Sequence, residues 1–338
     1  MRGMWHLRRW AKRIIPKAII LLYHRVAEVP SDPQLLCVSP KHFAEHLEVL
    51  RRYYHPLSLR SLRRRLAVNL WLPGSVVVTF DDGYADNLHN ALPLLEAADV
   101  PATVFIVAGQ LDSRQEFWWD ALERILLSTP QLPPDLTLTI NGQVYHWDFQ
   151  SSDEDHHSSG NWHILMTSSP TSRQAAYREL AALLREMESP VRKRQLEQLA
   201  AWAGLDVSAR PDYRTLTSDE MQMLAQDGLV EIGAHTMSHP VLSALPIEAQ
   251  QSEIVDSKRV LGEILGRPVT SFSYPFGSQS DYTPDTVRLV RDAGFDCACS
   301  TFSGPVMLGR DPYQLPRYLV RDWDGEEFAR RLQDWFCG

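Results

Sequence analysis

The chain has 338 residues, of which 44% are hydrophobic and 22% are charged. A chain of this size and composition can bury one large core or two modest ones, which excludes a wholly disordered protein. The formal net charge of −8 argues against a general nucleic-acid binder, because phosphate contacts need clustered Lys and Arg.

Residues 1–17 form a basic leader that contains six Lys and Arg residues and no Asp or Glu. The apolar run that follows at 18–22 has the length of a strand and is far short of the ~20 residues that span a bilayer, and no secretory signal is evident. A basic segment that carries Trp can make a peripheral contact with the anionic inner face of a membrane. A frayed basic terminus explains the leader equally well.

The four cysteines are too sparse for a disulfide framework and lack the Cys-x-x-Cys pairs of a zinc module. They are Cys37, Cys297, Cys299 and Cys337. We expect them to be reduced, buried thiols, which predicts a cytoplasmic protein that is at most peripheral to the inner membrane face.

The run at 18–22 is the first predicted strand, and it delivers His24 to its carboxyl end. Residues 41–50 then show an amphipathic helical pattern. His42 and His46 are four residues apart in this pattern, and both are predicted to lie on its solvated face.

Asp81 and Asp82 follow the run Ser-Val-Val-Val-Thr-Phe at 75–80, which predicts a buried strand that must stop at Gly83. A carboxylate at the rim of a packed core needs a metal, a proton or a cationic partner to offset its desolvation, and two adjacent carboxylates repel each other. An isolated Asp-Gly turn with a helix cap would explain the pair without chemistry. The histidines described below favour a functional pair instead.

Residues 87–98 show a helical pattern, after which the alternation of strands and helices weakens. We predict that residues 112–215 are a largely helical insertion at the end of a strand. It contains helical patterns at 173–188 and 191–203 and a polar run at 151–160.

Two tryptophans in this insertion, Trp118 and Trp119, could stack on sugar rings, although core packing is favoured for at least one of them. His156, His157 and His163 also lie in the insertion. A lone imidazole in a polar loop is usually a surface residue, so these three are not predicted to bind a metal.

Residues 217–220 match a capping box that begins a helix ending near Gly228. The next strand-like run, at 229–234, leads to His235 and His239. Residues four apart on a helical turn project from the same face, so both imidazoles can reach one ion at the ~2.0–2.1 Å that zinc prefers. One of the two aspartates can supply a third ligand and leave a position open for water, as in catalytic metal sites.

Three segments resemble the motifs of a known family: Thr79-Phe80-Asp81-Asp82-Gly83, His235-Thr236-Met237-Ser238-His239 and Ser273-Tyr274-Pro275-Phe276-Gly277. They are similar to the first three motifs of the polysaccharide deacetylases, also called NodB-homology or carbohydrate esterase family 4 enzymes, with the third motif in a variant form. The resemblance implies that residues 18–338 form one catalytic domain, a distorted parallel (β/α) barrel expected to have seven strands. It also implies metal-dependent removal of acetyl groups from N-acetylated sugars.

The order of the predicted elements agrees with such a barrel. Further strand-like runs at 269–274 and 297–301 also end in turn or polar residues. Alternating strands and helices predict parallel strands, and parallel barrels place their chemistry at the carboxyl ends. The candidate residues should therefore meet at one mouth.

The candidate residues predict a mechanism. One divalent ion, expected to be Zn²⁺, binds Asp82, His235 and His239, polarises the acetamide carbonyl and lowers the pKa of its bound water. Asp81 is the predicted general base. The resemblance points to the backbone amide of Phe276 as a donor to the oxyanion.

Two positions depart from the usual family pattern. Ser273 replaces an Arg that orients the catalytic Asp, and Arg317 is the candidate to clamp Asp81 with two hydrogen bonds, although an ordinary strand-end Arg is equally compatible. Related enzymes take their general acid from a late His, but no His follows His239. His24 is the candidate to protonate the leaving amine, and the alternative is a buried His that only holds a loop.

The sequence thus predicts a metal-dependent hydrolase that acts on carbon–nitrogen bonds of linear amides. Its expected substrate is an amino-sugar-containing polysaccharide or a glycan precursor, contacted by Tyr274, Phe276, Trp118 and Trp119. A metal-dependent amidase acting on a non-sugar amide would share every catalytic residue and stays open. An inactive carbohydrate-binding homologue is disfavoured because the base and all three ligands are present, and a glycosidase would need two carboxylates ~5–10 Å apart without a metal.

Overall fold

The computed structural model describes residues 17–70, 72–140, 142–149, 162–167, 171–206 and 208–337. The basic leader up to residue 16 lies outside the described residues, as do the polar run at 151–160 and, with it, His156 and His157. Among the residues that are described, no helix is both long enough and apolar enough to cross a bilayer.

The chain divides into two compact units. The barrel unit comprises Met1–Glu28, Leu36–Asp112 and Thr215–Gly338, and the helical unit comprises Val29–Leu35 and Ser113–Arg214. The helical unit includes a short segment, Val29–Leu35, that the sequence did not assign to it. The boundaries of a single catalytic domain stay a prediction.

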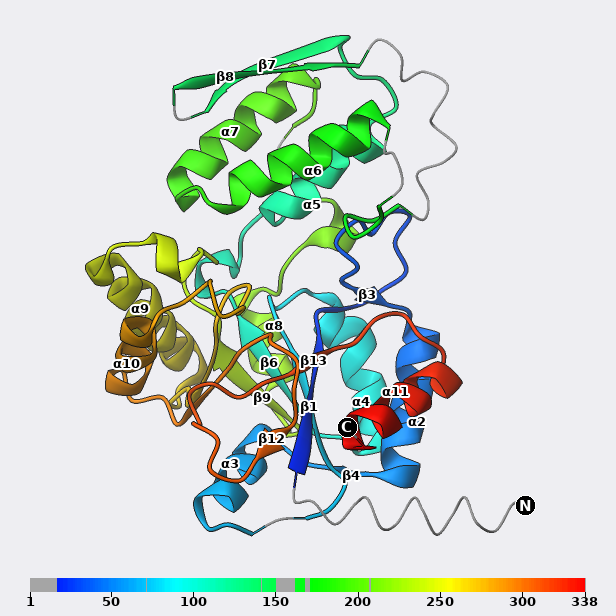
Figure 1. Cartoon of the computed structure of the whole chain (residues 1–338), viewed down its shortest axis with the longest axis vertical. Coiled ribbons are helices and arrows are strands. Elements are labelled where there is room, and N and C mark those ends of the chain that lie inside the picture. The colour runs from blue at the N-terminus through cyan, green and yellow to red at the C-terminus, as the bar shows by residue number, and fades with distance from the viewer. Residues whose placement is uncertain are drawn as a thin grey trace. The chain divides into compact units, whose positions relative to one another are not determined.

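The barrel unit is built on a nine-stranded sheet whose main path runs β11-β10-β9-β6-β5-β1-β12, with β4 beside β5 and β13 beside β1 (Figure 1). The strands are β1 (Lys17–Tyr23), β4 (His55–Pro56), β5 (Ser75–Phe80), β6 (Ala102–Ile106), β9 (Val230–Ala234), β10 (Ser271–Ser273), β11 (Cys297–Cys299), β12 (Val306–Met307) and β13 (Tyr318–Leu319). Only the pairing of β1 with β12 is antiparallel in this sheet; the other pairs are parallel. The seven strands of the main path form the curled wall of a distorted barrel, which confirms the predicted fold class.

The gap between β11 and β1 is bridged by residues 312–320. Leu315 donates its amide to the carbonyl of Ala298 and accepts from the amide of Ser300, both at 2.9 Å. Farther along the same segment, the amide of Val320 donates to the carbonyl of Leu22 at 3.0 Å. The segment therefore follows the edge of β11 and then the edge of β1, which brings Arg317 to the barrel interior.

Helices surround this sheet. Helices α2, α4 and α11 pack together beside β1, and α8, α9 and α10 form a second group (Figure 1). The helices of the barrel unit are α2 (Pro40–Tyr53), α3 (Leu59–Ala67), the π-helix η2 (Asn87–Ala91), α4 (Leu92–Ala98), η3 (Ala108–Gln110), α8 (Ser218–Leu224), η7 (Leu242–Ala244), α9 (Ile247–Leu265), α10 (Pro284–Asp292) and α11 (Gly325–Cys337). A small parallel pair, β2 (Arg25–Val26) with β3 (Cys37–Val38), follows β1. The predicted capping box is confirmed, because Thr217 caps α8 and Glu220 caps back to it.

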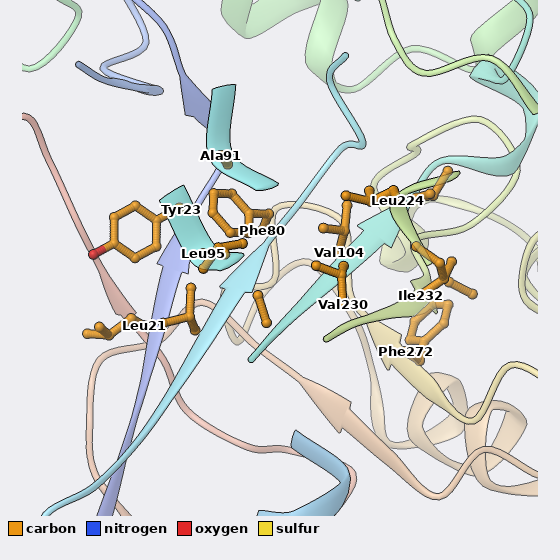
Figure 2. Packing of buried hydrophobic residues seen from close by; sticks show 14 of the residues in the cluster. Leu21, Tyr23, Phe80, Ala91, Leu95, Val104, Leu224, Val230, Ile232 and Phe272 are labelled. Carbon is orange, nitrogen blue, oxygen red and sulfur yellow. The ribbon is translucent and has the colours of Figure 1, made fainter. Parts of the chain in front are cut away.

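The period of two along β5 explains how the sheet separates core from site. Val76, Val78 and Phe80 belong to the outer core that packs against the helices, and Figure 2 shows Phe80 beside Tyr23, Ala91 and Leu95. Val77 belongs instead to the inner cluster, which fills the barrel. Successive side chains of a strand point to opposite faces. The same alternation therefore turns Thr79, and Asp81 directly after β5, toward the barrel interior.

His46 is fully buried, so the prediction that it lies on a solvated face is wrong. Its Nδ1 lies 3.2 Å from the hydroxyl of Tyr23 and its Nε2 lies 2.7 Å from the carbonyl oxygen of Trp323. The ring stacks on Phe328 at 4.0 Å. The periodicity of α2 could not show this, because the covering residues come from the far end of the chain.

The helical unit contains the two predicted helices, α6 (Ser172–Arg185) and α7 (Ser189–Trp202), together with α5 (Trp118–Glu123), η4 (Arg124–Ser128) and η6 (Pro211–Tyr213). It also contains an antiparallel hairpin, β7 (Asp135–Ile140) and β8 (Gln143–Asp148), which the sequence analysis missed. Strand β7 alternates exposed and buried residues along its length. The Leu-Thr-Leu-Thr-Ile run is the period-two signal that could have found it.

Candidate metal and catalytic site

The candidate residues converge at the carboxyl ends of the barrel strands, as predicted. Asp81 and Asp82 follow β5, His235 follows β9 and Ser273 ends β10. Backbone hydrogen bonds continue the sheet into these positions, since the amide of Asp81 donates to Tyr23 at 3.0 Å and that of His235 donates to Ile106 at 2.9 Å. The hydrogen bonds of the sheet therefore fix the backbone positions of Asp81 and His235.

Asp82, His235 and His239 form a buried group whose ligand atoms all lie within 4.8 Å of one another. The Oδ1 atom of Asp82 lies 3.6 Å from Nε2 of His235 and 3.5 Å from Nε2 of His239. Two ligands that each lie ~2.1 Å from a tetrahedral zinc ion are about 3.4 Å apart. The donor set and its spacing therefore fit one divalent ion.

His235 has the protonation state of a metal ligand. Its Nδ1 lies 2.7 Å from the carbonyl oxygen of Ser273. A carbonyl only accepts, so Nδ1 carries the proton and Nε2 presents its lone pair toward Asp82. Burial lowers the pKa of His235, which keeps the ring neutral. A carbonyl behind the outer nitrogen is the usual means of orienting a ligating imidazole.

The segment from His235 to His239 is a bent loop, so the predicted helical turn is wrong. The two rings nevertheless lie 4.9 Å apart between centroids. Glu253 of α9 holds the loop by accepting hydrogen bonds from the amides of Met237 and Ser238, at 2.8 and 2.9 Å, and from the Ser238 hydroxyl at 2.6 Å. Spacing along the sequence could not distinguish a helical turn from a loop held in this way.

Backbone strain is concentrated at the site. Eight non-glycine residues of the described chain have a positive φ, and four of them are Asp82 (+74°), Thr236 (+66°), His239 (+55°) and Phe276 (+59°). L-residues avoid this region because of steric clashes, and such conformations typically persist at functional sites at about 1–3 kcal/mol each. The strain supports a functional site, since packing alone gives no reason for it.

Asp81 is clamped by Arg317 through two hydrogen bonds, both 2.7 Å long. The guanidinium is fully buried and also donates to the carbonyl of Ser300 at 2.8 Å, to the hydroxyl of Thr79 at 3.2 Å and to the hydroxyl of Ser273 at 2.8 Å. Burial alone would raise the pKa of Asp81, but the charge and hydrogen bonds of Arg317 outweigh it and hold the pKa well below its usual range. Asp81 is therefore an oriented, ionised carboxylate.

Ser273 has a place in the same arrangement. Its hydroxyl donates to Oδ2 of Asp81 at 3.1 Å while it accepts from Arg317. A small side chain on β10 leaves room for a guanidinium that reaches Asp81 from a different part of the chain. This explains how the variant third motif can lack its usual Arg.

His24 lies at the carboxyl end of β1, and its Nδ1 is a buried atom with no hydrogen-bond partner among the described residues. Burial is the main cause that lowers its pKa to about 3, with Arg317 acting in the same direction and Asp81 opposing it. The imidazole is therefore neutral at pH 7. Asn87 fixes the backbone here by donating to the His24 carbonyl at 2.9 Å.

Sequence reasoning missed the support beneath His24. Asp86 pairs with the buried Arg25 at 2.9 Å and accepts from the amide of Val26 at 3.0 Å. Asp86 and Asn87 follow the first motif by a few residues, in Tyr-Ala-Asp-Asn, and this polar pair before a helical pattern was the available signal.

The predicted substrate contacts differ in position. Tyr274 is fully buried, stacks on Tyr282 at 4.0 Å and donates its hydroxyl to the carbonyl of Tyr313. Phe276 is partly exposed and its ring lies 4.7 Å from that of His239. Phe276 therefore borders the candidate metal site, whereas the contacts of Tyr274 are explained by packing.

Trp118 and Trp119 belong to the helical unit, where they are only 8% and 5% exposed. Trp119 stacks on Phe117 at 4.6 Å, and Arg192 lies over the ring of Trp118 at 5.6 Å. Packing accounts for both rings, and their contact with a sugar stays a prediction.

Residues 72–129 and 196–298 match the family model described as polysaccharide deacetylase. These segments include Asp81, Asp82, His235, His239 and the third motif. Over these two segments the chain is similar to the polysaccharide deacetylase family.

A Bacillus subtilis (strain 168) protein named as a polysaccharide deacetylase, YxkH, is 31% identical over 105 residues. That alignment covers 31% of the chain and only 36% of YxkH. Among solved structures, the Streptococcus pyogenes deacetylase PplD in complex with acetate matches with a TM-score of 0.59 and 18% identity over 94% of the chain and 98% of PplD. IcaB from Ammonifex degensii matches with a TM-score of 0.57 and 18% identity over 96% of the chain and 98% of IcaB. At these identities the structural likeness establishes the fold alone.

Proposed function

We propose that this protein is a metal-dependent hydrolase that removes N-acetyl groups from an amino-sugar-containing glycan. The observation that carries the proposal is the buried group of Asp82, His235 and His239, which lies beside an ionised Asp81 clamped by Arg317. The match of residues 72–129 and 196–298 to the polysaccharide deacetylase family model supports the reaction class. We propose Zn²⁺ as the ion because two imidazoles and one carboxylate are typical zinc ligands.

When bound, the ion supplies Lewis-acid polarisation of the acetamide carbonyl and lowers the pKa of a coordinated water. Asp81 takes a proton from the attacking water. The bidentate contact with Arg317 leaves the carboxylate little freedom to rotate, and its low pKa keeps it ionised over the neutral range. Arg317 acts through Asp81 and is a positioning residue.

The developing negative charge on the carbonyl oxygen needs hydrogen-bond donors. We assign this role to the backbone N–H of Phe276, whose residue has a positive φ and borders His239. A backbone donor works whatever the side chain is, which is consistent with a variant third motif.

We assign proton delivery to the leaving amine to His24. Its ring is neutral at rest, so it must first receive a proton, and the proton that Asp81 takes from water is the available source. Asp81 is thereby returned to its ionised form at the end of the cycle. In the alternative, His24 is a buried residue that only holds a loop. That alternative predicts that replacing the imidazole does not selectively lower turnover.

The test is acetate release from a panel of N-acetylated glycans, measured with and without a chelator. We expect turnover that a chelator abolishes and that Zn²⁺ restores, and we expect Asp81→Asn to lower kcat by about a hundredfold or more while metal binding is retained. Retained turnover in Asp81→Asn would refute the base assignment. Activity on simple amides without activity on any glycan would favour the alternative of a general metal-dependent amidase.

We also propose that the protein works in a reducing compartment, as the predicted cytoplasmic location requires. All four cysteines are free, and three of them, Cys37, Cys297 and Cys299, are buried. Burial raises the pKa of the Cys299 thiol to about 12, which disfavours the reactive thiolate. Recovery of the native protein in a periplasmic or secreted fraction would contradict the location.

A further inference from the structure

Positive charge is concentrated in one part of this acidic protein. Residues 49–80 contain six arginines, Arg51, Arg52, Arg60, Arg63, Arg64 and Arg65, and no Asp or Glu, although the net charge of the chain is −8. Four of these arginines lie in α3, and two end α2. Among the described residues, Arg51, Arg52, Arg64 and Arg65 make no ion pair.

Helix α3 lies across the amino ends of the barrel strands, opposite the candidate site. Leu59 and Leu62 belong to the inner cluster that fills the barrel, and Leu66 packs against it. On the flanks of the helix, Arg60 pairs with Glu231 near the start of β9 at 3.1 Å, and Arg63 pairs with Asp296 just before β11 at 3.4 Å. The apolar face of α3 therefore closes this end of the barrel, and Arg64 is left exposed.

The turn that ends α3 holds two apolar side chains in solvent. Asn69 has a left-handed φ of +55°, its amide donates to Leu66, and the amide of Leu70 donates to Arg65 at 2.9 Å. This pair of bonds is a Schellman motif, which gives the turn a defined conformation. Val68 and Leu70 are nonetheless 69% and 58% exposed.

A second exposed apolar pair lies at the same end of the barrel. Met307 and Leu308 are 39% and 52% exposed. Met307 pairs with Lys17, the first residue of β1. The next residue of β1, Ala18, pairs with Ser75, the first residue of β5, so Met307 lies at the amino ends of these two strands. The basic leader joins the described chain at Lys17.

We propose that this end of the barrel is a docking surface for an anionic phospholipid bilayer, in which Val68 and Leu70 enter the interface and the arginines contact the headgroups. Apolar side chains flanked by Lys and Arg are the combination that binds such interfaces. Basic side chains interact favourably with a helix C-terminus, which explains Arg64 and Arg65 in the last turn of α3. This interaction gives no reason for the exposed side chains of Val68 and Leu70 beside them. The proposal does not rest on the deacetylase assignment.

A second copy of the chain fits this surface poorly. A two-fold interface would place the arginines of one copy against those of the other, which is repulsive. Anionic polymers would satisfy the charge but would leave the apolar pair without a role. The lipid surface is the occupant that uses both features.

The test is co-sedimentation of the full-length protein with vesicles of phosphatidylcholine alone or mixed with phosphatidylglycerol. We expect binding only to the mixed vesicles, with an affinity that falls as salt is added. We expect Val68→Ser with Leu70→Ser to weaken binding about tenfold, and Arg64→Gln with Arg65→Gln to weaken it by a similar factor.

The matched control is Met223→Ser with Arg288→Gln, which removes one exposed apolar residue and one exposed arginine from α8 and α10. It should bind as the parent does. The proposal is overturned if the parent does not bind, if either double variant binds like the parent, or if the control weakens binding equally. Self-association that Val68→Ser with Leu70→Ser abolishes, without vesicle binding, would also overturn it in favour of a second copy. Acetate release from a small substrate in solution should be equal in all variants, which separates this test from that of the catalytic proposal.

Discussion

The buried ion pair of Asp81 and Arg317 places two opposite charges in the barrel interior. Removing one partner of such a pair leaves an uncompensated charge and typically costs about 3–5 kcal/mol. The pair is therefore poorly explained as a stabilising device, because apolar residues would serve as well. Its geometry suits the orientation of a base.

Arg317→Lys keeps the positive charge but loses the bidentate hydrogen bonding to Asp81. We expect kcat/KM to fall about a hundredfold, because the carboxylate is no longer held in one orientation. Weaker stabilisation of the carboxylate also raises the pKa of Asp81 toward its usual value, so the acid limb of the pH profile should move to higher pH. A pH profile of kcat/KM measures both effects.

The matched control is Arg259→Lys, which changes an exposed arginine that pairs with Glu263 on α9. Its profile should match that of the parent. An unchanged acid limb in Arg317→Lys would show that the guanidinium does not act through Asp81.

His46 makes stability depend on pH. Burial lowers the pKa of His46 from 6.5 to about 4. Between these values the unfolded chain binds a proton that the folded chain does not, so the free energy of unfolding falls as the pH falls from 6.5 to 4, by about 3 kcal/mol in total. We expect His46→Gln to remove this part of the dependence, as measured by urea unfolding at pH 7 and pH 5. Equal slopes in parent and variant would contradict the prediction.

Residue types and motifs were enough to name Asp81, Asp82, His235 and His239 as candidates, which the structure brings together, because chemistry restricts which side chains can serve. The partner of Asp81 could be named only as a candidate, since nothing local connects residues 81 and 317. His46 was assigned wrongly for the same reason. Its burial depends on Phe328 and Trp323, which are distant in the sequence.

At the scale of elements, the loop after β9 depends on α9. Glu253 accepts three hydrogen bonds from residues 237 and 238. We expect Glu253→Ala to weaken metal binding about ten- to a hundredfold, because the loop that carries His239 loses its support. Competition with a chelating dye measures this affinity. Glu263→Ala, on the same helix but exposed, should have no effect.

The packing of β9 against β6 requires a glycine at position 233. A Cβ atom there would lie 2.3 Å from Cδ1 of Phe105 and 2.8 Å from the hydroxyl of Ser271. We expect Gly233→Ala to lower the free energy of unfolding by about 3 kcal/mol or more. Adding Phe105→Val should recover part of the loss, and denaturant unfolding of the single and double variants measures it. Gly262→Ala in α9, whose added Cβ meets nothing closer than 3.5 Å, should be neutral or stabilising.

At the scale of the whole molecule, the alternation of apolar strands and amphipathic helices predicted parallel strands, and the resemblance to the polysaccharide deacetylases implied that these strands form a barrel. Neither was sufficient to predict how the barrel closes, because residues 312–320 contribute single backbone contacts and the short strand β13 rather than a continuous apolar run. The β7–β8 hairpin was missed because a polar, half-exposed strand carries a weaker signal than a buried one. The assignment of Val29–Leu35 to the helical unit has no local signal at all.

The origin of Arg317 in the closing segment has a consequence for the order in which the protein matures. A ribosome delivers Asp82, His235 and His239 well before residue 317, so the parts needed to capture an ion are synthesised while the barrel is still open. The side chain that locks Asp81 arrives only when residues 312–320 join β11 to β1. Capture of the proposed ion can thus precede competence for the proposed hydrolysis, and turnover would then report barrel closure, which metal content cannot do.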